Sequence, residues 1–410
     1  MNAEQFTKLK ALLQRVQQKS PFYQNKFKAA GFDIADIQTP ADIAQLPFTT
    51  KEELREAYPL NIQAAPDEEI VRIHSSSGTT GKPIIIPYTA QDVAVWAEMM
   101  HRCMSVAGLT AKDRVQITPG YGLWTAGIGF QAGVERLGAM AIPMGPGNTE
   151  KQLQMMMDLQ STVIAATSSY ALLLAEEIHK RGLKEHIKLK KAILGSERWG
   201  DKMRIRIREE LGVELYDIYG LTEIYGPGIS ISCSACNGLH YWDDYLLFEV
   251  IDPQTGKPVA DGEFGELVIT TLTKEGAPLL RYRTRDITRM LTGECSCGLP
   301  HPRHDLILGR TDDMVKVKGV NIYPGQVEDV LKHLEGISSE YQIVIDREEG
   351  KDAMLLRFEQ QEGFDATSLE LRVKKYFKTK VGLTINAQVL SIGQLPRSEK
   401  KTARVIDNRY

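Results

Sequence analysis

A short segment at residues 75–83 combines hydroxyl side chains, glycines and one lysine, which are groups that bind nucleotide phosphates. Its sequence is Ser-Ser-Ser-Gly-Thr-Thr-Gly-Lys-Pro. Glycines let backbone N–H groups approach an anion, and Lys82 supplies a positive charge. The segment is not a Walker A motif, because too few residues follow Gly78 and Pro83 replaces the magnesium-binding hydroxyl. It predicts a phosphate-binding loop, and the alternative is a surface turn. The candidate ligands are Ser75, Ser76, Ser77, Gly78, Thr79, Thr80 and Lys82.

Four of the five cysteines lie in two close pairs, a spacing typical of metal sites. Cys233 and Cys236 form a C-x-x-C, His240 follows four residues later, and Cys295 and Cys297 form a C-x-C. In a cytosolic chain such pairs indicate metal rather than disulfides. Zinc takes four nitrogen or sulfur ligands in a tetrahedron, so we expect one structural zinc. Two further candidate metal ligands are His301 and His304. A histidine beside proline and arginine is more often a surface residue.

The segment at residues 119–128, Pro-Gly-Tyr-Gly-Leu-Trp-Thr-Ala-Gly-Ile, could bind a flat ring. Its small residues leave room for the ring, and Tyr121 and Trp124 can line it by edge-to-face packing. We therefore expect an aryl or arylacetic acid here rather than a long acyl chain. The alternative is a glycine-rich loop with aromatics packed into the core. The candidate substrate residues are Tyr121, Gly122, Trp124, Thr125 and Ala126.

The composition argues against two broad classes of partner. Lysine plus arginine number 50 against 53 aspartate plus glutamate, a net charge of −3, so the basic excess of a nucleic-acid binder is missing. No apolar run approaches the roughly 20 residues of a membrane span, and the first residues lack a basic-then-apolar signal. We expect a soluble, cytoplasmic protein, and the 410 residues suggest more than one domain.

The elements that must position these residues are predicted to form an α/β fold. Phe6, Leu9, Leu13 and Val16 predict an amphipathic helix over residues 3–18. From about 70 to 230, short apolar runs alternate with helical patterns, as in βαβ units with a mainly parallel sheet. Ligands of such sheets bind beyond the carboxyl ends of the strands, where residues 195–197 and 219–223 are expected.

The rest of the chain predicts two further parts. From about residue 244 the apolar residues alternate, as in a small β-barrel or antiparallel sheet. After Arg310 a helix over 327–334, strands at 343–345 and 354–356, a helix over 369–376 and a strand at 385–390 predict a small α+β domain of about 100 residues. We expect a large domain over residues 1–311 and a small one over 312–410.

Five motifs, taken in order, resemble those of the adenylate-forming superfamily of acyl- and aryl-CoA synthetases, luciferases and peptide-synthetase adenylation domains. After the loop at 75–83 come Tyr-Asp-Ile-Tyr-Gly-Leu-Thr-Glu at 216–223, Tyr-Arg-Thr-Arg-Asp at 282–286, Gly-Arg-Thr-Asp-Asp at 309–313 and Lys-Val-Lys-Gly at 316–319. Three further segments look most like the phenylacetate-CoA ligase family: Ser-Pro-Phe-Tyr at 20–23, Gly-Val-Asn-Ile-Tyr-Pro at 319–324 and Leu-Pro-Arg-Ser-Glu at 395–399. The resemblance covers most of the chain.

The resemblance implies an ATP-dependent, AMP-forming ligase that joins an aryl or arylacetic acid, phenylacetate first among them, to coenzyme A through an acyl-adenylate. Mg²⁺ would be the cofactor, because the transition state gathers charge on phosphate oxygens. One alternative is a stand-alone adenylating enzyme that passes the acyl group to a carrier protein or another acceptor. Another is a nucleotide-binding relative that keeps the fold without turnover.

The resemblance also implies a role for each motif. Residues 75–82 would bind the β and γ phosphates, Thr222 the α-phosphate and Glu223 the magnesium, whereas outside this context Thr222 and Glu223 would suit a helix cap. Asp286 would accept hydrogen bonds from the ribose hydroxyls, with Arg285 standing where the family has glycine. Arg310 would reach the nucleotide. The remaining nucleotide-site residues, of which the first six would frame the adenine, are Gly195, Ser196, Glu197, Asp217, Ile218, Tyr219 and Gly220.

Near the C-terminus, residues 396–402 resemble the family's closing motif, whose lysine bridges the carboxylate and ATP. This likeness places the catalytic lysine at Lys401, with Lys400 where the family has glycine, so the choice between the two stays open. The C-terminal domain would rotate about Asp312 between the half-reactions. One arrangement would present Lys401, and the other would present to the pantetheine arm the residues Lys318, Gly319, Val320 and Asn321.

Finally, the resemblance bears on the choice of metal ligands and on the oligomeric state. In ligase relatives, the metal ligands include a cysteine that lies seven residues before the histidine of a Gly-Leu-His segment. The other ligands come from the C-x-C-Gly motif. That pattern favours Cys233, His240, Cys295 and Cys297, and a four-cysteine site that includes Cys236 is the competitor. The zinc would join two loops without an open coordination position. The family also implies a homodimer.

Overall fold

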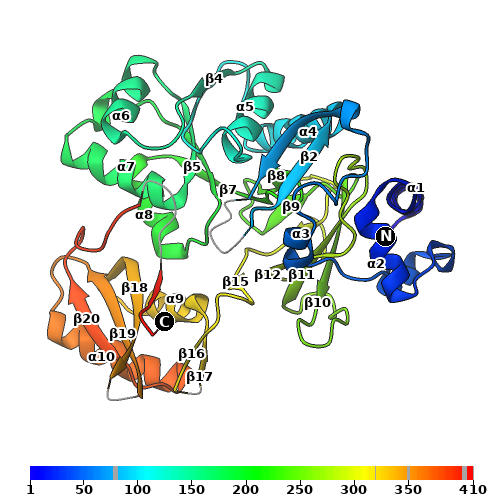
Figure 1. The fold of residues 1–410 in the computed structure, drawn as a ribbon. Coiled ribbons are helices and arrows are strands. Elements are labelled where there is room, and N and C mark those ends of the chain that lie inside the picture. The colour runs from blue at the N-terminus through cyan, green and yellow to red at the C-terminus, as the bar shows by residue number, and fades with distance from the viewer. Residues whose placement is uncertain (77–81, 319, 349–350, 399–403, 410) are drawn as a thin grey trace.

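The structure is a computed structural model that describes residues 1–76, 82–318, 320–348, 351–398 and 404–409 (Figure 1). It opens with helix α1 (Ala3–Lys19), whose buried side chains include the predicted Leu9, Leu13 and Val16. The side chains of Asn2 and Gln5 cap this helix reciprocally. The segments that follow are α2 (Pro21–Ala30), η1 (Ile34–Asp36), η2 (Pro40–Gln45), α3 (Lys51–Glu56) and η3 (Asp67–Glu69).

A nine-stranded sheet lies at the centre of the large domain, and its first five strands are parallel, as the βαβ pattern predicts. In spatial order the parallel strands are β4 (Met140–Pro143), β3 (Arg114–Ile117), β5 (Val163–Thr167), β6 (Lys191–Gly195) and β7 (Glu214–Leu221). The antiparallel continuation consists of β8 (Gly226–Ser232), β9 (Leu239–Tyr241), β14 (Arg303–His304) and β13 (Met290–Leu291).

Helices cover both faces of the parallel strands. Val163 and Ala165 pack in the core cluster that includes α4 (Ala90–Val106) and α5 (Ala126–Leu137). Ile164 and Ala166 pack on the opposite face in a second cluster. Because successive strand residues point to opposite faces, covering both faces requires the unbroken apolar run seen at 163–166. The second face is covered by α6 (Thr149–Asp158), α7 (Ser168–Lys180) and α8 (Asp201–Leu211), with η4 (Lys184–His186) nearby.

Two smaller antiparallel units complete the large domain. The hairpin of β1 (Ile70–Ser75) and β2 (Ile85–Thr89) flanks the predicted phosphate loop. Beyond residue 244 the alternating pattern forms a four-stranded antiparallel sheet, in agreement with the sequence prediction. Its strands are β10 (Leu246–Ile251), β11 (Gly265–Thr271), β12 (Tyr282–Thr288) and β15 (Gly309–Arg310).

The C-terminal domain is α+β and has its own core, formed by residues between Val317 and Val405. The predicted helices and strands are present, and most extend beyond the predicted residues. The elements are β16 (Val315–Val317), β17 (Val320–Ile322), α9 (Pro324–Lys332), β18 (Ile337–Glu348), β19 (Lys351–Gln360), α10 (Ala366–Val381), β20 (Asn386–Leu390) and β21 (Val405–Asp407). Among the described residues, no helix is both long and apolar enough to cross a bilayer.

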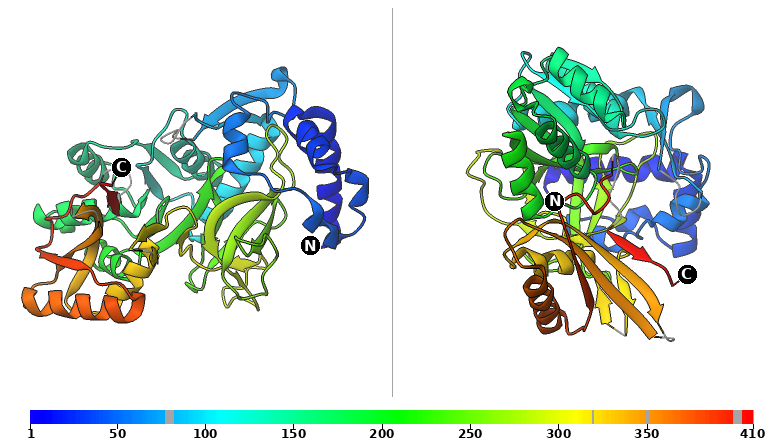
Figure 2. Two further views of the ribbon diagram at one scale, coloured as in Figure 1. Left: turned by 60° about the horizontal axis from the view of Figure 1, so that its bottom comes forward. Right: turned by 90° about the vertical axis from the view of Figure 1, so that its left-hand side faces the viewer.

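Polar contacts join the two domains beside α7 and α8. The Lys202 Nζ donates to the backbone carbonyls of Leu334 and Ile337, at 2.8 and 2.7 Å. Arg397 forms a 2.7 Å ion pair with Glu176 on α7. Figure 1 and the left view of Figure 2 show the C-terminal domain next to these helices and α1 on the opposite side of the large domain.

Candidate nucleotide and acid site

The carboxyl ends of β6 and β7 bring together two of the predicted adenine-framing segments. Gly195 pairs with Ile218 across the two parallel strands. A Cβ at position 195 would lie 2.1 Å from the Ile218 carbonyl oxygen, so this approach requires glycine. Ser196, the next residue, has a positive φ of 72° and leads the chain out of the sheet. The two segments therefore meet at the sheet edge where ligands of parallel sheets bind.

Two carboxylates of these segments are engaged by protein groups. Glu197 accepts hydrogen bonds from the Ser168 hydroxyl and the Ser169 N–H, at 3.0 and 2.6 Å, at the start of α7. Asp217 accepts a 3.1 Å bond from the Trp199 indole and pairs with Arg204. Burial raises the pKa of Asp217 despite that arginine. These contacts hold the edge of the site rigid.

Asp286 is the centre of a second cluster, which the β12–β15 pairing assembles. Its backbone pairs with that of Arg310, and its carboxylate accepts bonds from the Tyr219 hydroxyl at 2.6 Å and the Arg310 guanidinium at 3.1 Å. Asp286 is only 5% exposed. Burial raises the pKa of Asp286 to about 6, although Arg310 and Tyr219 act in the opposite direction. Motifs from three separate segments thus converge on one buried carboxylate.

Arg285, which replaces the family's glycine, keeps a backbone conformation that favours glycine. Its φ is 65°. The side chain makes ion pairs with Glu52 at 2.6 Å and with Asp312 at 3.2 Å. Asp312 is also bonded to Arg310, at 2.8 Å. Position 285 therefore lies within strand β12, where the pairing with β11 shifts register, and the arginine adds charged contacts around the residue at which we predicted the hinge.

Thr222 and Glu223 lie in the turn between β7 and β8. The alternative that they cap a helix is wrong, because the chain passes from one strand to the next there. The Thr222 hydroxyl is 3.4 Å from that of Thr125 in the predicted acid-binding segment. Glu223 is buried, and its carboxylate is 3.5 Å from the Nζ of Lys51. The sequence reasoning missed Lys51, whose only local signal is its place as the first residue of a capped helix, α3.

The predicted phosphate loop is described at its two ends only. The Ser75 N–H donates to the Leu123 carbonyl at 2.9 Å, and the Ser76 hydroxyl accepts from the Ile84 N–H at 3.0 Å. Lys82 is exposed, with its Nζ 5.7 Å from the ring centre of Tyr58. The first contact joins the start of the loop to the acid-binding segment, and the second joins the two strands that flank the loop. Outside the described residues lie Ser77, Gly78, Thr79 and Thr80.

The predicted aromatic residues of the acid site have different environments. The Tyr121 hydroxyl is buried without a hydrogen bond to any described residue, and burial raises the pKa of Tyr121 to about 12. Trp124 is 45% exposed, and Gly122 is exposed between them. Thr125 is buried and Ala126 begins α5. Tyr121 therefore faces the interior, whereas Trp124 contacts solvent.

The four favoured metal ligands come together around one point. The sulfurs of Cys233 and Cys295 are 3.6 Å apart, and the Cys297 sulfur is 3.3 Å from the His240 Nε2. All four ligand atoms lie within 4.8 Å of one another. A tetrahedral zinc with bonds of about 2.3 Å would separate its sulfurs by about 3.8 Å, so the donor set fits zinc. Cys236 is exposed and is not in this group.

The two further histidine candidates, His301 and His304, are not members of this group. The His240 Nδ1 lies 2.7 Å from the His301 carbonyl oxygen, so Nδ1 carries the proton and Nε2 is left for a metal. His304 is fully buried, with its Nε2 2.8 Å from the Ser230 hydroxyl. Burial lowers the pKa of His304 to about 4. The expectation of a surface position is therefore wrong for His304.

The remaining predicted residues belong to the C-terminal domain. Lys318 has a φ of 49°, and Val320 and Asn321 lie on β17, opposite Val317 and Lys316 on β16. Outside the described residues lie Gly319, Lys400 and Lys401.

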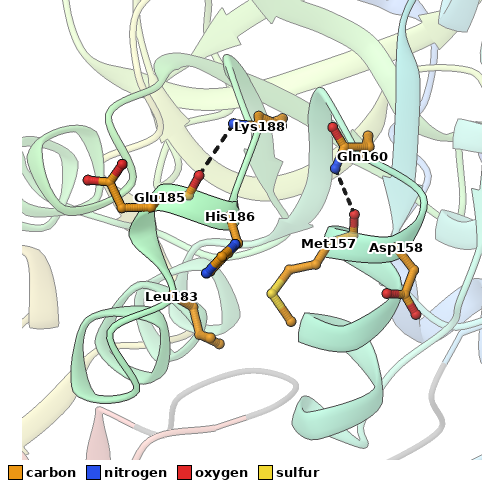
Figure 3. Close-up of a pocket in the computed structure, with 7 residues that line it drawn as sticks. All are labelled: Met157, Asp158, Gln160, Leu183, Glu185, His186 and Lys188. Carbon is orange, nitrogen blue, oxygen red and sulfur yellow. Dashed lines mark hydrogen bonds between the residues drawn. The ribbon is translucent and has the colours of Figure 1, made fainter.

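A separate pocket opens between the end of α6 and η4, and it contains none of the predicted site residues (Figure 3). Its volume is about 460 Å³. Within it the Lys188 Nζ donates to the Glu185 carbonyl at 3.3 Å, and the Gln160 amide donates to the Met157 carbonyl at 3.1 Å. The Lys188 ammonium and the Gln160 amide are thus bonded to nearby backbone carbonyls. We assign this pocket no part in the nucleotide and acid site.

Comparison with known proteins agrees with this geometry. The model of the AMP-binding enzyme family matches residues 7–273, and that of the AMP-binding enzyme C-terminal domain matches residues 319–409. A phenylacetate-coenzyme A ligase from Escherichia coli (strain K12) is 40% identical over 418 residues, covering 100% of this chain and 95% of the relative.

Solved structures of one enzyme in two states give a further comparison. The crystal structure of 2-hydroxyisobutyryl-CoA ligase in the postadenylation state has a TM-score of 0.89 at 28% identity, covering 99% of this chain and 89% of that one. The same ligase in the thioesterification state has a TM-score of 0.72 at 29% identity, with the same coverage. The present arrangement of domains is thus closer to the postadenylation state.

Proposed function

We propose that this chain, which belongs to the phenylacetate-coenzyme A ligase family of AMP-binding enzymes, activates phenylacetate with ATP and transfers the acyl group to coenzyme A. The observation that carries the proposal is the Tyr219–Asp286–Arg310 cluster beside the Thr222–Glu223 turn. It provides a buried carboxylate for ribose next to hydroxyl and carboxylate groups for phosphate and magnesium.

The described residues would divide the adenylation chemistry among them. Asp286 accepts hydrogen bonds from the ribose hydroxyls, and Thr222 donates to the α-phosphate. Glu223 would hold Mg²⁺, which would neutralise charge on the phosphates. Lys51 lies close enough to Glu223 to orient that carboxylate. Lys82, with the loop that follows Ser76, would bind the outer phosphates.

The acid site is proposed between the Tyr121 segment and the turn at Thr222. The 3.4 Å contact between the hydroxyls of Thr125 and Thr222 supports the adjacency of the acid and the α-phosphate. Such adjacency is what attack of a carboxylate oxygen on phosphorus requires. An aromatic acid would contact the ring of Tyr121 by edge-to-face packing.

The domain roles belong to the same proposal. We place the boundary and the hinge at Asp312, with Lys401 acting in adenylation and Lys318–Asn321 in thioester formation. The likeness to a postadenylation structure supports two working arrangements of the domains. A structural zinc bound by Cys233, His240, Cys295 and Cys297 is supported by their geometry. A cytoplasmic homodimer rests on the family resemblance alone.

The test is phenylacetate-dependent conversion of ATP to AMP and pyrophosphate, with and without coenzyme A, followed by mass detection of the thioester. We expect thioester only when all three substrates are present, and a loss of at least about 100-fold in Asp286→Ala. Glu249→Gln is the matched control, because the Glu249 side chain is only 13% exposed and also pairs with an arginine, Arg281, at 3.1 Å.

Each other outcome points elsewhere. Pyrophosphate and acyl-adenylate formed without thioester, with coenzyme A present, would favour transfer to a carrier protein or another acceptor. Absence of AMP with phenylacetate would contradict the proposed substrate, and absence with a panel of aryl acids would contradict the proposed activity.

A further inference from the structure

Lys274 is a fully buried lysine that lies outside every motif described above. It follows β11 and is 0% exposed. Its Nζ is 4.6 Å from the ring centres of both Tyr88 and Tyr225, so two aromatic faces enclose the ammonium group. A buried ammonium group is costly unless it is well bonded, so its position calls for a specific explanation.

The hydrogen bonds of Lys274 go to the turn that carries the proposed magnesium residue. Its Nζ donates to the backbone carbonyl of Ile224 and lies 3.4 Å from that of Glu223. The next carbonyl, that of Tyr225, accepts a 2.9 Å bond from the Tyr88 hydroxyl. Three consecutive carbonyls directly after Thr222 are therefore held by side chains from two other segments.

The segment that carries Lys274 is itself fixed. The buried carboxylate of Asp92, on α4, accepts 2.8 Å hydrogen bonds from the N–H groups of Glu275 and Gly276. Tyr88 is on β2, the strand that returns from the predicted phosphate loop. The carbonyls of the Glu223 turn are thus attached to a rigid support and to the hairpin that flanks the loop.

We propose that Lys274 is a positioning residue for adenylation: by bonding to the carbonyls of Glu223 and Ile224, it holds Thr222 and Glu223 in register with the β1–β2 hairpin. This inference rests on the proposed function. Lys274 would act on Thr222 and Glu223 through the backbone carbonyls of the turn, without contacting the substrates itself. Thioester formation takes place after pyrophosphate has left, so it should depend much less on this register.

The test compares the two half-reactions in Lys274→Met, which keeps the length of the side chain and removes its donor. We expect adenylation, followed as pyrophosphate released in the absence of coenzyme A, to fall about 10- to 100-fold, and thioester formation from supplied phenylacetyl-adenylate to change less than about threefold. Lys191→Met is the matched control. Its Nζ also donates to two consecutive carbonyls, those of Ala107 and Gly108, both at 2.7 Å, but at the opposite end of the sheet.

A second variant protects the test against a folding defect. Tyr88→Phe removes only the hydroxyl that bonds to the Tyr225 carbonyl, and it should show the same selective loss to a smaller degree. Equal losses in both half-reactions for Lys274→Met and Tyr88→Phe, or an equally selective loss in Lys191→Met, would overturn the inference.

Failure of the proposed function would be recognised separately, because the wild type would then make no AMP from phenylacetate. In that case Mg²⁺-dependent ATP binding, measured by calorimetry, replaces the half-reactions. Lys274→Met should weaken the binding of ATP about tenfold when Mg²⁺ is present and much less when Mg²⁺ is absent. Equal affinities of wild type and variant for ATP with Mg²⁺ would overturn the inference.

Discussion

At the scale of single residues, Asp286 combines two opposing requirements. Its pKa of about 6 means that burial disfavours the ionised form, yet ribose hydroxyls need an ionised acceptor. The folded-state pKa of Asp286 lies above the ordinary value for an aspartate. The free energy of unfolding therefore falls as the pH rises from that ordinary value to about 6, because Asp286 ionises in a buried position. Nucleotide binding should reverse this preference and release a proton.

We therefore predict that adenosine binds about tenfold more weakly at about pH 5 than at about pH 7.5. Adenosine is the proper probe, since it has no phosphate that titrates in this range. Calorimetry at the two pH values measures the effect. Asp286→Asn should bind weakly at both, and Glu249→Gln should keep the wild-type dependence. A wild-type affinity that is flat across the range would contradict the role of Asp286.

The sequence predicted Asp286, Arg310 and Tyr219 because each lies in a contiguous motif, but it did not predict the residues that act on these motifs from elsewhere. Lys51 reaches Glu223 only because α3 packs against the four-stranded sheet. Lys274 reaches the same turn through the packing of β2 and α4. A single side chain carries no local signal of a partner brought close by tertiary packing.

At the scale of elements, the cysteine–histidine cluster joins two loops that are distant in the chain. Cys233 and His240 lie around the β8–β9 connection, and Cys295 and Cys297 lie between β13 and β14. Spacing alone left Cys236 as a competitor. The structure favours the set with His240 over the set with Cys236, because the Cys236 sulfur lies outside the cluster and is 3.7 Å from the Ser234 carbonyl.

We predict that the purified protein contains about one equivalent of zinc and that Cys233→Ser removes it and lowers the melting temperature by several degrees. Cys236→Ser is the control and should keep both the zinc and the melting temperature. Elemental analysis and thermal unfolding make the comparison. Less than about half an equivalent in the wild type, or loss of zinc in Cys236→Ser, would contradict the ligand set.

At the scale of the whole molecule, Arg397 lies at the contact between the domains. It is bonded to Glu176 of the large domain at 2.7 Å and to Glu359 of its own domain at 2.8 Å. Arg397 belongs to the closing motif that resembles the family's catalytic segment. The ion pair with Glu176 should therefore favour the arrangement used for adenylation.

We predict that Glu176→Gln shifts the ratio of the two half-reaction rates about fivefold or more towards thioester formation, because the pair with Arg397 belongs to one arrangement only, whereas the 2.7 Å pair of Glu176 with Arg206 lies within the large domain. Glu177→Gln, at the next position of α7, is the control, because Glu177 pairs within its own helical segment with Lys180 and Arg181. The rates are measured separately with ATP plus acid and with supplied adenylate. An unchanged ratio in Glu176→Gln would show that this ion pair does not bias the domains.

The polar character of the domain contact has a consequence for the solution conditions under which the enzyme works. Ion pairs and lysine-to-carbonyl bonds join the domains, while the C-terminal apolar core consists of residues from its own domain. Salt screens charges over a Debye length of about 8 Å at physiological ionic strength, yet leaves apolar packing intact. Ionic strength should then shift the balance between domain arrangements without unfolding either domain, and the two half-reactions should have different salt optima.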